Sequence, residues 1–364
     1  MALNFNNKKR SLLFLVTGTT LFLTFTGARV QNQSVLAQTA KKYPLPLNDP
    51  AAILAPNLVN IPPIIPPAQN RTLNVPSSQP SNNVEIGYDV RTRSTKVGAR
   101  IQILPQNQSS TNFSPAYRGG DTNVNLEPRV SGSISPNTVQ PHTVIGSDDR
   151  VLITNTTAYP WRTITKLFMT FPSGKKFVCS GTLIAAKYVL TAGHCIHNSS
   201  EGGWANKVEV VPGLSGTYKP YGSAFAAYMR SYTAWTSSQN PNYDFALITL
   251  NKNIGNTTGW LGYAYYPSIN GITANLAGYP GDRNSGLGLY YHYGPVMSST
   301  SQRLFYSIDT AGGQSGSGVY RRINSDRYVF AVHTNGSGGT LYNSGARIDS
   351  QKFNDIKRWI ASGT

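Results

Sequence analysis

The chain has 364 residues, of which 39% are hydrophobic and 11% aromatic, enough for a core in one large or two medium domains. Lysine and arginine (32) outnumber aspartate and glutamate (15), which gives a formal net charge of +17. The excess is spread along the chain, with 13 basic and 5 acidic residues in 1–142 against 19 and 10 in 143–364. This distribution argues against a nucleic-acid-binding stripe and favours a cationic surface that attracts acidic partners.

The N-terminus predicts export. Lys8-Lys9-Arg10 forms a positive region, and the mostly apolar run Leu12–Phe25 covers 14 residues, which is short for a membrane-spanning helix. We expect a secretory signal peptide over residues 1–37, cut after Ala37, with Ala28 as the other candidate position. An uncleaved membrane anchor is the alternative. The predicted location is extracellular or periplasmic, without membrane attachment once the signal is removed.

Residues 38–142 predict a removable pro-segment. Ten prolines lie between Tyr43 and Pro80, a composition typical of extended, polyproline-like chain without a core of its own. Residues 81–142 are rich in Ser, Asn, Gly and Thr and show only fragments of a strand pattern, such as 99–104. A spacer to the cell surface is the alternative.

From about Val144 onward, short β-branched and aromatic runs alternate with Gly, Asn, Pro and Ser clusters. This pattern predicts an all-β domain over residues 143–364, either a sandwich or a pair of barrels. The expected strands include 163–167, 207–211, 245–250, 272–276, 304–308 and 328–333.

A helical period occurs only near the C-terminus. There Ser350 is expected to cap a helix whose Phe353, Ile356 and Ile360 share one face. We expect this face to pack on the β domain rather than to bind a partner.

Two cysteines occur, Cys179 and Cys195. This number excludes a four-cysteine zinc site and a small disulfide-framework fold. Two free thiols remain an alternative, but a disulfide is favoured in an exported chain.

Ser315 lies in a glycine-rich run between Asp309 and Gly318. Glycine permits positive φ and close approach of a substrate backbone, so such a turn can aim consecutive N–H groups at a developing oxyanion. Taken alone, the run fits a flexible Gly/Ser loop equally well. A nucleophilic serine also needs a base and an orienting group from elsewhere in the chain.

His194 and Asp244 are the candidates for those two parts. His194 precedes Cys195, which can tie the turn back to Cys179 and hold the imidazole near a hydroxyl. Asp244 stands at the start of an apolar strand, where a partly buried carboxylate needs a partner. Pairing with His194 would hold the imidazole in the useful tautomer. The plainer interpretations are a surface histidine beside a structural disulfide and an aspartate in a turn.

The other histidines have no comparable setting. His197 is expected on a loop surface, among Asn198, Ser199 and Ser200, and neither His142 nor His292 has neighbours of this kind.

Three motifs occur in the order His, Asp, Ser: Thr191-Ala192-Gly193-His194-Cys195, Asp244-Phe245-Ala246-Leu247 and Gly313-Gln314-Ser315-Gly316. On these motifs, residues 143–360 resemble the trypsin-like serine proteases, and among them the bacterial glutamyl endopeptidases. Supporting stretches are 143–150, 156–160, 277–282 and 331–336. The resemblance implies two six-stranded antiparallel β-barrels with the active site between them. It also implies a monomer that cleaves proteins or peptides without a metal or cofactor.

The same resemblance implies the chemical roles. His194 would take the proton of Ser315 during attack on the peptide carbonyl, and Asp244 would stabilise the imidazolium. The backbone N–H groups of Gly313 and Ser315 would bind the oxyanion.

Specificity has two interpretations. Asp309, six residues before Ser315, would predict cleavage after Arg or Lys in a trypsin-like pocket. The glutamyl family instead binds a substrate carboxylate through a histidine and a hydroxyl, which here correspond to His333 and Thr310.

Composition favours the second interpretation. Residues 143–364 contain two glutamates, Glu201 and Glu209, against 19 lysines and arginines. An enzyme that cleaves after Glu would therefore expose few sites to itself. We expect cleavage after Glu, and more weakly after Asp, in acidic substrates.

Activation is expected to differ from that of trypsin. Gln314, not an aspartate, precedes Ser315, so a freed N-terminus has no carboxylate to pair with there. The resemblance implies that a new N-terminus near Thr143 or Val144 helps to form the specificity pocket. Removal of the residues up to about 142 is then the switch. A non-catalytic secreted binding protein on the same fold is the alternative.

Overall fold

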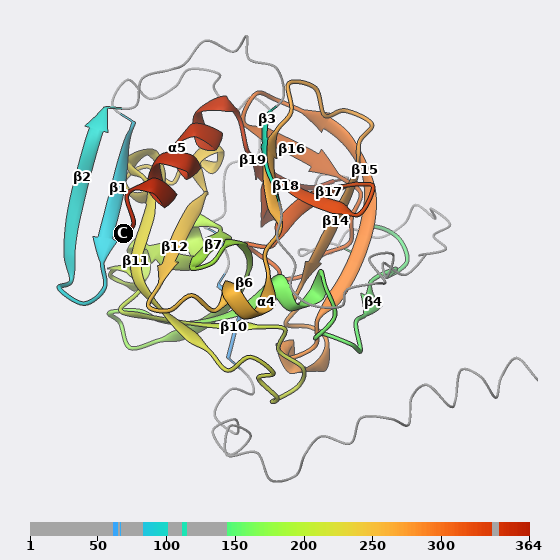
Figure 1. Cartoon of the computed structure of the whole chain (residues 1–364), viewed down its shortest axis with the longest axis horizontal. Helices are drawn as coiled ribbons and strands as arrows, with labels where there is room; N and C mark the ends of the chain where they lie inside the picture. Colours follow the sequence, from blue (N-terminus) through green and yellow to red (C-terminus); the bar gives the residue numbers. More distant parts are fainter. Residues whose placement is uncertain (1–60, 65, 67–82, 101–110, 115–143, 337–341) are drawn as a thin grey trace, which may run out of the picture. The chain divides into compact units, whose positions relative to one another are not determined.

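The computed structural model describes residues 61–64, 66, 83–100, 111–114, 144–336 and 342–364 (Figure 1). The predicted signal peptide, its two candidate cleavage positions and most of residues 38–142 lie outside these ranges. Within the described ranges, no helix is long and apolar enough to cross a membrane.

The first barrel closes six antiparallel strands in the order β10-β5-β6-β7-β12-β11, with β10 paired back to β11. The strands are β5 (Ile164–Thr170), β6 (Lys176–Ala185), β7 (Tyr188–Thr191), β10 (Lys207–Pro212), β11 (Ala224–Tyr232) and β12 (Ala246–Leu250). β7 and β12 are buried along their whole length, as their apolar sequences require. Between them they position the histidine and the aspartate of the site.

The second barrel repeats this plan in the order β17-β14-β15-β16-β19-β18, closed by the β17–β18 pair. The strands are β14 (Thr273–Gly278), β15 (Tyr290–Ser299), β16 (Arg303–Tyr306), β17 (Gly318–Ile323), β18 (Asp326–Asn335) and β19 (Asn343–Arg347). Its interior holds Leu276, Val296, Leu304 and Phe330. The predicted pair of six-stranded antiparallel barrels is confirmed, and each of the six expected strands is present within a few residues.

Four of the described strands outside the barrels form a hairpin and a strand pair. The hairpin β1 (Val84–Asp89) and β2 (Ser94–Arg100) extends the first barrel through β11 (Figure 1). β3 (Thr111–Phe113) pairs with β13 (Gly262–Tyr265), which pairs in parallel with β18. The sequence patterns do not predict the β1–β2 hairpin. Of the expected strand 99–104, the first two residues belong to β2 and the rest lie outside the described residues.

The C-terminal helix α5 (Ser350–Ala361) packs on the first barrel, as predicted. Its N-cap is Asp349, not Ser350, because the Asp349 carboxylate accepts a hydrogen bond from the Lys352 amide at 2.8 Å. Trp359 rather than Ile360 completes the buried face, and its ring lies 5.5 Å from that of Tyr232 in β11.

The remaining elements are short. They are β4 (Val151–Leu152), β8 (His197–Asn198), β9 (Gly203–Trp204), α2 (Gly193–Ile196), α3 (Thr233–Thr236), α4 (Gly255–Thr258), η3 (Trp161–Thr163), η4 (Ser199–Glu201), η5 (Pro241–Tyr243) and η6 (Asn284–Gly286). Of these, α2 and η5 matter most here, because the histidine lies in the first and the aspartate follows the second.

Candidate active site

His194 and Asp244 meet where two neighbouring strands of the first barrel end. β7 leads into α2, which carries His194, and Asp244 lies just before β12. Because Thr191 in β7 pairs with Ala246 in β12, the two side chains are brought to the same end of the barrel. Asp244 Oδ2 lies 2.8 Å from His194 Nδ1, and Oδ1 accepts the His194 backbone N–H at 2.8 Å. The carboxylate therefore fixes both the ring and the main chain of the histidine.

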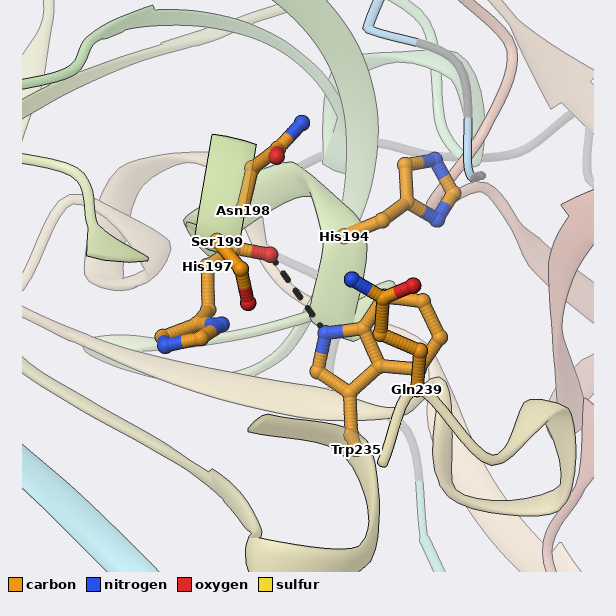
Figure 2. A pocket seen from close by; sticks show the side chains of 6 residues that line it. All are labelled: His194, His197, Asn198, Ser199, Trp235 and Gln239. Carbon is orange, nitrogen blue, oxygen red and sulfur yellow. Dashed lines mark hydrogen bonds between the residues drawn. The ribbon is translucent and has the colours of Figure 1, made fainter. Parts of the chain in front are cut away.

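Both side chains are buried, with exposed fractions of 0% for His194 and 1% for Asp244. Isolated burial of a carboxylate is costly, so the two contacts to His194 are what make this position tolerable. The predicted disulfide between Cys179 and Cys195 is present beside them. Trp235 packs edge-on against the His194 ring at 6.3 Å and, with His197 and Gln239, lines a small pocket next to it (Figure 2).

The other ring nitrogen of His194, Nε2, is buried and has no hydrogen-bond partner among the described residues. It is therefore not hydrogen-bonded to the Ser315 hydroxyl. Contacts between base and nucleophile are often loose before a substrate is bound.

Ser315 lies in a tight turn whose glycines are required by geometry. Gly313 and Gly316 have φ of +99° and +88°, values that favour glycine. A Cβ on Gly313 would lie 2.6 Å from the Tyr279 carbonyl oxygen, and one on Gly316 would collide with the Ser180 carbonyl oxygen. Ser180 also stabilises the turn, because its hydroxyl donates a hydrogen bond to Gly313 O and its amide donates one to Ser315 O, both at 2.8 Å. The first barrel thus holds the turn of the second.

The N–H groups of Gly313 and Ser315 donate no hydrogen bond to any described residue. Their neighbours Gln314 and Gly316 both donate, to Ala311 O and His333 O. The two N–H groups expected to bind an oxyanion are therefore the ones that the turn leaves available.

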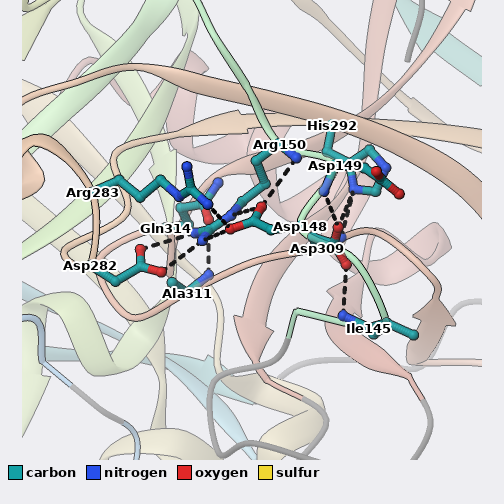
Figure 3. A network of polar contacts seen from close by, with 10 residues as sticks. All are labelled: Ile145, Asp148, Asp149, Arg150, Asp282, Arg283, His292, Asp309, Ala311 and Gln314. Atoms are coloured by element: carbon teal, nitrogen blue, oxygen red, sulfur yellow. Dashed lines mark hydrogen bonds and ion pairs between the residues drawn. The ribbon is translucent and has the colours of Figure 1, made fainter. Parts of the chain in front are cut away.

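Asp309 is turned toward the main chain of residues 145–149 (Figure 3). Its two carboxylate oxygens accept the backbone N–H groups of Ile145 at 2.8 Å and Asp149 at 2.9 Å. Burial raises its pKa to about 6, and the two N–H groups oppose that rise. Asp309 therefore anchors this segment instead of presenting its charge to a pocket.

His333 lies in β18 beside the turn, since its carbonyl accepts Gly316 N–H and its amide donates to Ser317 O. Its Nδ1 lies 2.5 Å from the Tyr306 hydroxyl. Burial holds the pKa of Tyr306 well above its ordinary value, so the phenol keeps its proton and can donate it to Nδ1. In that tautomer the ring proton of His333 is on Nε2. Thr310, the other expected pocket residue, is 1% exposed and lies just before the turn.

These features agree with what related proteins show. The sequence matches the Trypsin family over residues 153–360. The chain belongs to this family. A glutamyl endopeptidase of Bacillus licheniformis is 38% identical over 293 residues, which cover 78% of this chain and 86% of that protein.

Two further proteins are similar to the chain, and the solved structure supports the assignment. An "extracellular metalloprotease" of Bacillus subtilis is 35% identical over 262 residues, which cover 71% of this chain and 80% of that protein. A solved Glu endopeptidase in complex with MPD has a TM-score of 0.55 at 31% identity and covers 60% of this chain and all of its own. Within the trypsin family the chain is thus a member of the glutamyl endopeptidase family, and it is a serine endopeptidase.

One histidine of this protease differs from the sequence-based interpretation, and a second has a structural role that the sequence did not indicate. His197 is not a loop-surface residue, because it packs edge-on against Trp204 and burial lowers its pKa to about 4. His292 is buried under the site, where its Nδ1 accepts the backbone N–H of Asp309 at 2.8 Å. The partner of His197 is seven residues away in the neighbouring strand β9, and that of His292 is the backbone of Asp309.

Two groups of side chains carry potential metal ligands in the described part of the protease. The first contains Cys179 and Cys195, whose sulfurs are joined in the disulfide. The second consists of Asp149, His292 and Asp309. There the Asp309 oxygens and the His292 Nδ1 already accept backbone hydrogen bonds. Neither group offers a set of free donors that would identify a metal site.

Arg303 and Tyr306 were not identified from the sequence, although both support the site. Arg303 is buried and donates to the carbonyl of Pro241, which begins the turn that leads to Asp244, at 2.7 Å. It also donates to Asn335 Oδ1 at 3.1 Å, at the end of the His333 strand. Alternation within β16 predicts that Tyr306 points inward with Leu304, but it does not predict the burial of Arg303 on the other face or the partners of either residue.

The first residues of the domain are held by a charged network (Figure 3). Arg150 pairs with Asp148 and with Asp282, each at 2.7 Å. Thr143, one of the two predicted mature N-terminal residues, lies outside the described residues, while the other, Val144, is described and partly buried.

Proposed function

We propose that this protease is secreted as a proenzyme and hydrolyses peptide bonds after Glu, and more weakly after Asp. Residues 1–37 are the signal peptide, 38–142 the pro-segment and 143–364 the protease domain. The cationic surface attracts acidic protein or peptide substrates to a monomeric enzyme.

Catalysis follows from the geometry of the site. His194 Nε2 accepts the proton of Ser315 as its oxygen attacks the substrate carbonyl, and later returns it to the leaving amine. Asp244 holds Nδ1–H and stabilises the imidazolium. The available N–H groups of Gly313 and Ser315 bind the oxyanion, each worth about 3 kcal/mol in the transition state.

The orientation of Asp309 carries the specificity proposal. Asp309 is 1% exposed and both of its oxygens accept backbone N–H groups, so its charge holds residues 145–149 rather than binding an Arg or Lys side chain of the substrate. In the tautomer in which Tyr306 donates to His333 Nδ1, Nε2 carries the ring proton and would bind a substrate carboxylate together with the Thr310 hydroxyl. A histidine and a hydroxyl suit Glu better than they suit a cation.

The same aspartate supports the proposal of activation by cleavage. Asp309 holds Ile145, two residues beyond Thr143, next to the specificity pocket. A cut near Thr143 or Val144 changes the end of this anchored segment and thereby the shape of the pocket.

The test uses fluorogenic peptides that differ only in Glu, Gln or Arg before the bond. We expect the mature enzyme to prefer Glu over Arg by at least about 100-fold in kcat/KM. Ser315→Ala should abolish hydrolysis, and His333→Ala should reduce the preference for Glu over Gln. A preference for Arg would refute the specificity, and hydrolysis that survives Ser315→Ala would refute the catalytic assignment.

A further inference from the structure

A short piece of the predicted pro-segment lies on β6 close to the candidate active site. Val178 N–H donates to Pro62 O at 2.9 Å, and Ile64 N–H donates to Val178 O at 3.2 Å. Pro63 and Val178 thus form a parallel bridge. Ile64 is 1% exposed and belongs to the main hydrophobic core, so this contact has a buried side-chain anchor.

This contact lies beside the nucleophile. Val178 precedes Cys179 of the disulfide and stands two residues before Ser180, whose amide donates to Ser315 O. On the other side, Pro63 lies next to Gly281: a Cβ on Gly281 would be 3.5 Å from Pro63 Cδ. Gly281 N–H donates at 2.7 Å to Gly312 O, directly before the oxyanion turn.

The edge of β6 at Val178 is suited to an extended peptide. β7 pairs with β6 only from Thr182 to Ala185, so at Val178 this side of the strand has no barrel neighbour. An exposed strand edge binds peptides by adding a strand through main-chain hydrogen bonds. The pocket residues Thr310 and His333 belong to the second barrel and would hold the residue before the scissile bond. Residues after that bond then leave toward the first barrel, where Val178 lies.

We infer that residues 61–64 are a built-in inhibitory strand that occupies the binding path for the part of the substrate after the scissile bond. This inference rests on the proposed function of the site. The segment uses the N–H and C=O of Val178, the same groups that a bound substrate would need.

The segment is built to bind without being cleaved. It runs parallel to β6, and residues 59–68 (VNIPPIIPPA) contain no Glu or Asp. Pro63 favours an extended backbone before binding, which lowers the entropic cost of docking.

The test adds a synthetic peptide of residues 59–68 to enzyme matured from the full chain. At about 5 mM, comparable to the effective concentration of a tethered segment, we expect the apparent KM of a quenched peptide with four residues beyond Glu to rise about tenfold. Hydrolysis of an acyl-Glu-anilide, which has no residues beyond Glu, should change less than about twofold. The peptide with Ile64→Asp should not inhibit, whereas Pro62→Ala, which alters an exposed side chain and keeps the carbonyl, should inhibit normally.

A second measurement uses the full chain with Ser315→Ala, which cannot process itself. Hydrogen exchange at the Val178 amide should be slow, fast after Ile64→Asp and still slow after Pro62→Ala. Equal inhibition of both substrates, no inhibition, or unchanged exchange after Ile64→Asp would overturn the inference. If neither Glu substrate is cleaved even without peptide, the proposed function fails. The exchange experiment still tests whether residues 61–64 bind at Val178.

Discussion

Asp244 and Asp309 are both 1% exposed, yet the structure gives them different partners. Asp244 places its two oxygens on the ring and the amide of one residue, His194. Asp309 places its oxygens on two backbone amides of the segment that begins the domain. Asp244 is hydrogen-bonded to the ring of the proposed catalytic base, whereas both hydrogen bonds to the Asp309 carboxylate come from neutral backbone amides, with the His292 ring 3.5 Å away. The comparison teaches that position relative to Ser315 does not determine what a buried aspartate does.

The largest expected effect is that of Asp244→Asn on kcat. An amide can no longer hold His194 in the tautomer that accepts the serine proton, so kcat should fall about 10⁴-fold. Steady-state hydrolysis of a Glu peptide measures this, with near-UV circular dichroism to confirm that the variant is folded. A fall of less than about tenfold in a folded variant would remove the distinction between the two aspartates.

Asp309 is expected to have a smaller effect, on the pH dependence of the free energy of unfolding. Because burial holds the folded pKa of Asp309 at about 6, above its ordinary 3.8, the folded state keeps a proton that the unfolded state has lost. This stabilisation is complete below about pH 4 and is lost as the pH rises through about 6, by on the order of 2 kcal/mol.

Urea unfolding of wild type and Asp309→Asn at pH 4 and pH 7 measures that contribution. The decrease in unfolding free energy between the two pH values should be smaller in Asp309→Asn. Identical pH dependence in the two proteins would show that Asp309 ionises as freely as an exposed carboxyl.

The smallest effect is expected on the activity of Asp309→Asn. Its amide nitrogen cannot accept a backbone N–H, so one of the two anchoring bonds is lost and kcat/KM for Glu peptides should fall up to about tenfold. The order of preference, Glu over Arg, should not change. Arg cleavage that is present in the wild type and lost in the variant would show that Asp309 is a pocket residue after all.

The sequence was sufficient where the relevant partners are local or the pattern is strong. Alternating short strands and turns predicted an all-β domain, and the motif resemblance predicted its two barrels. The Cys179–Cys195 disulfide was predicted from the two cysteines of a chain expected to be exported. His194 and Asp244 stand at strand ends, where their motifs predicted them. These features depend mainly on residues close together in the chain.

The sequence was insufficient where a partner comes from a distant strand. The hydrogen bond of His333 with Tyr306 and that of Asp309 with Ile145 depend on how strands and segments are placed side by side. The contact of Ile64 with Val178 joins residues more than a hundred positions apart, in a stretch whose composition indicates only extended chain. Local periodicity contains no information about such contacts.

The strands β1 and β3 add a consequence for the timing of the proposed maturation. β1 pairs with β11 of the first barrel and β3 with β13 beside the second. Glu85 also pairs with Arg230 at 3.3 Å and with Arg358 of α5 at 2.9 Å. A single cut near residue 143 breaks none of these contacts. The immediate product of cutting is therefore a two-chain complex, and its lifetime is set by the rate at which the N-terminal piece dissociates. Cleavage and release are separate steps. Dilution and salt promote the loss of the N-terminal piece after the cut, but they do not accelerate the cut itself.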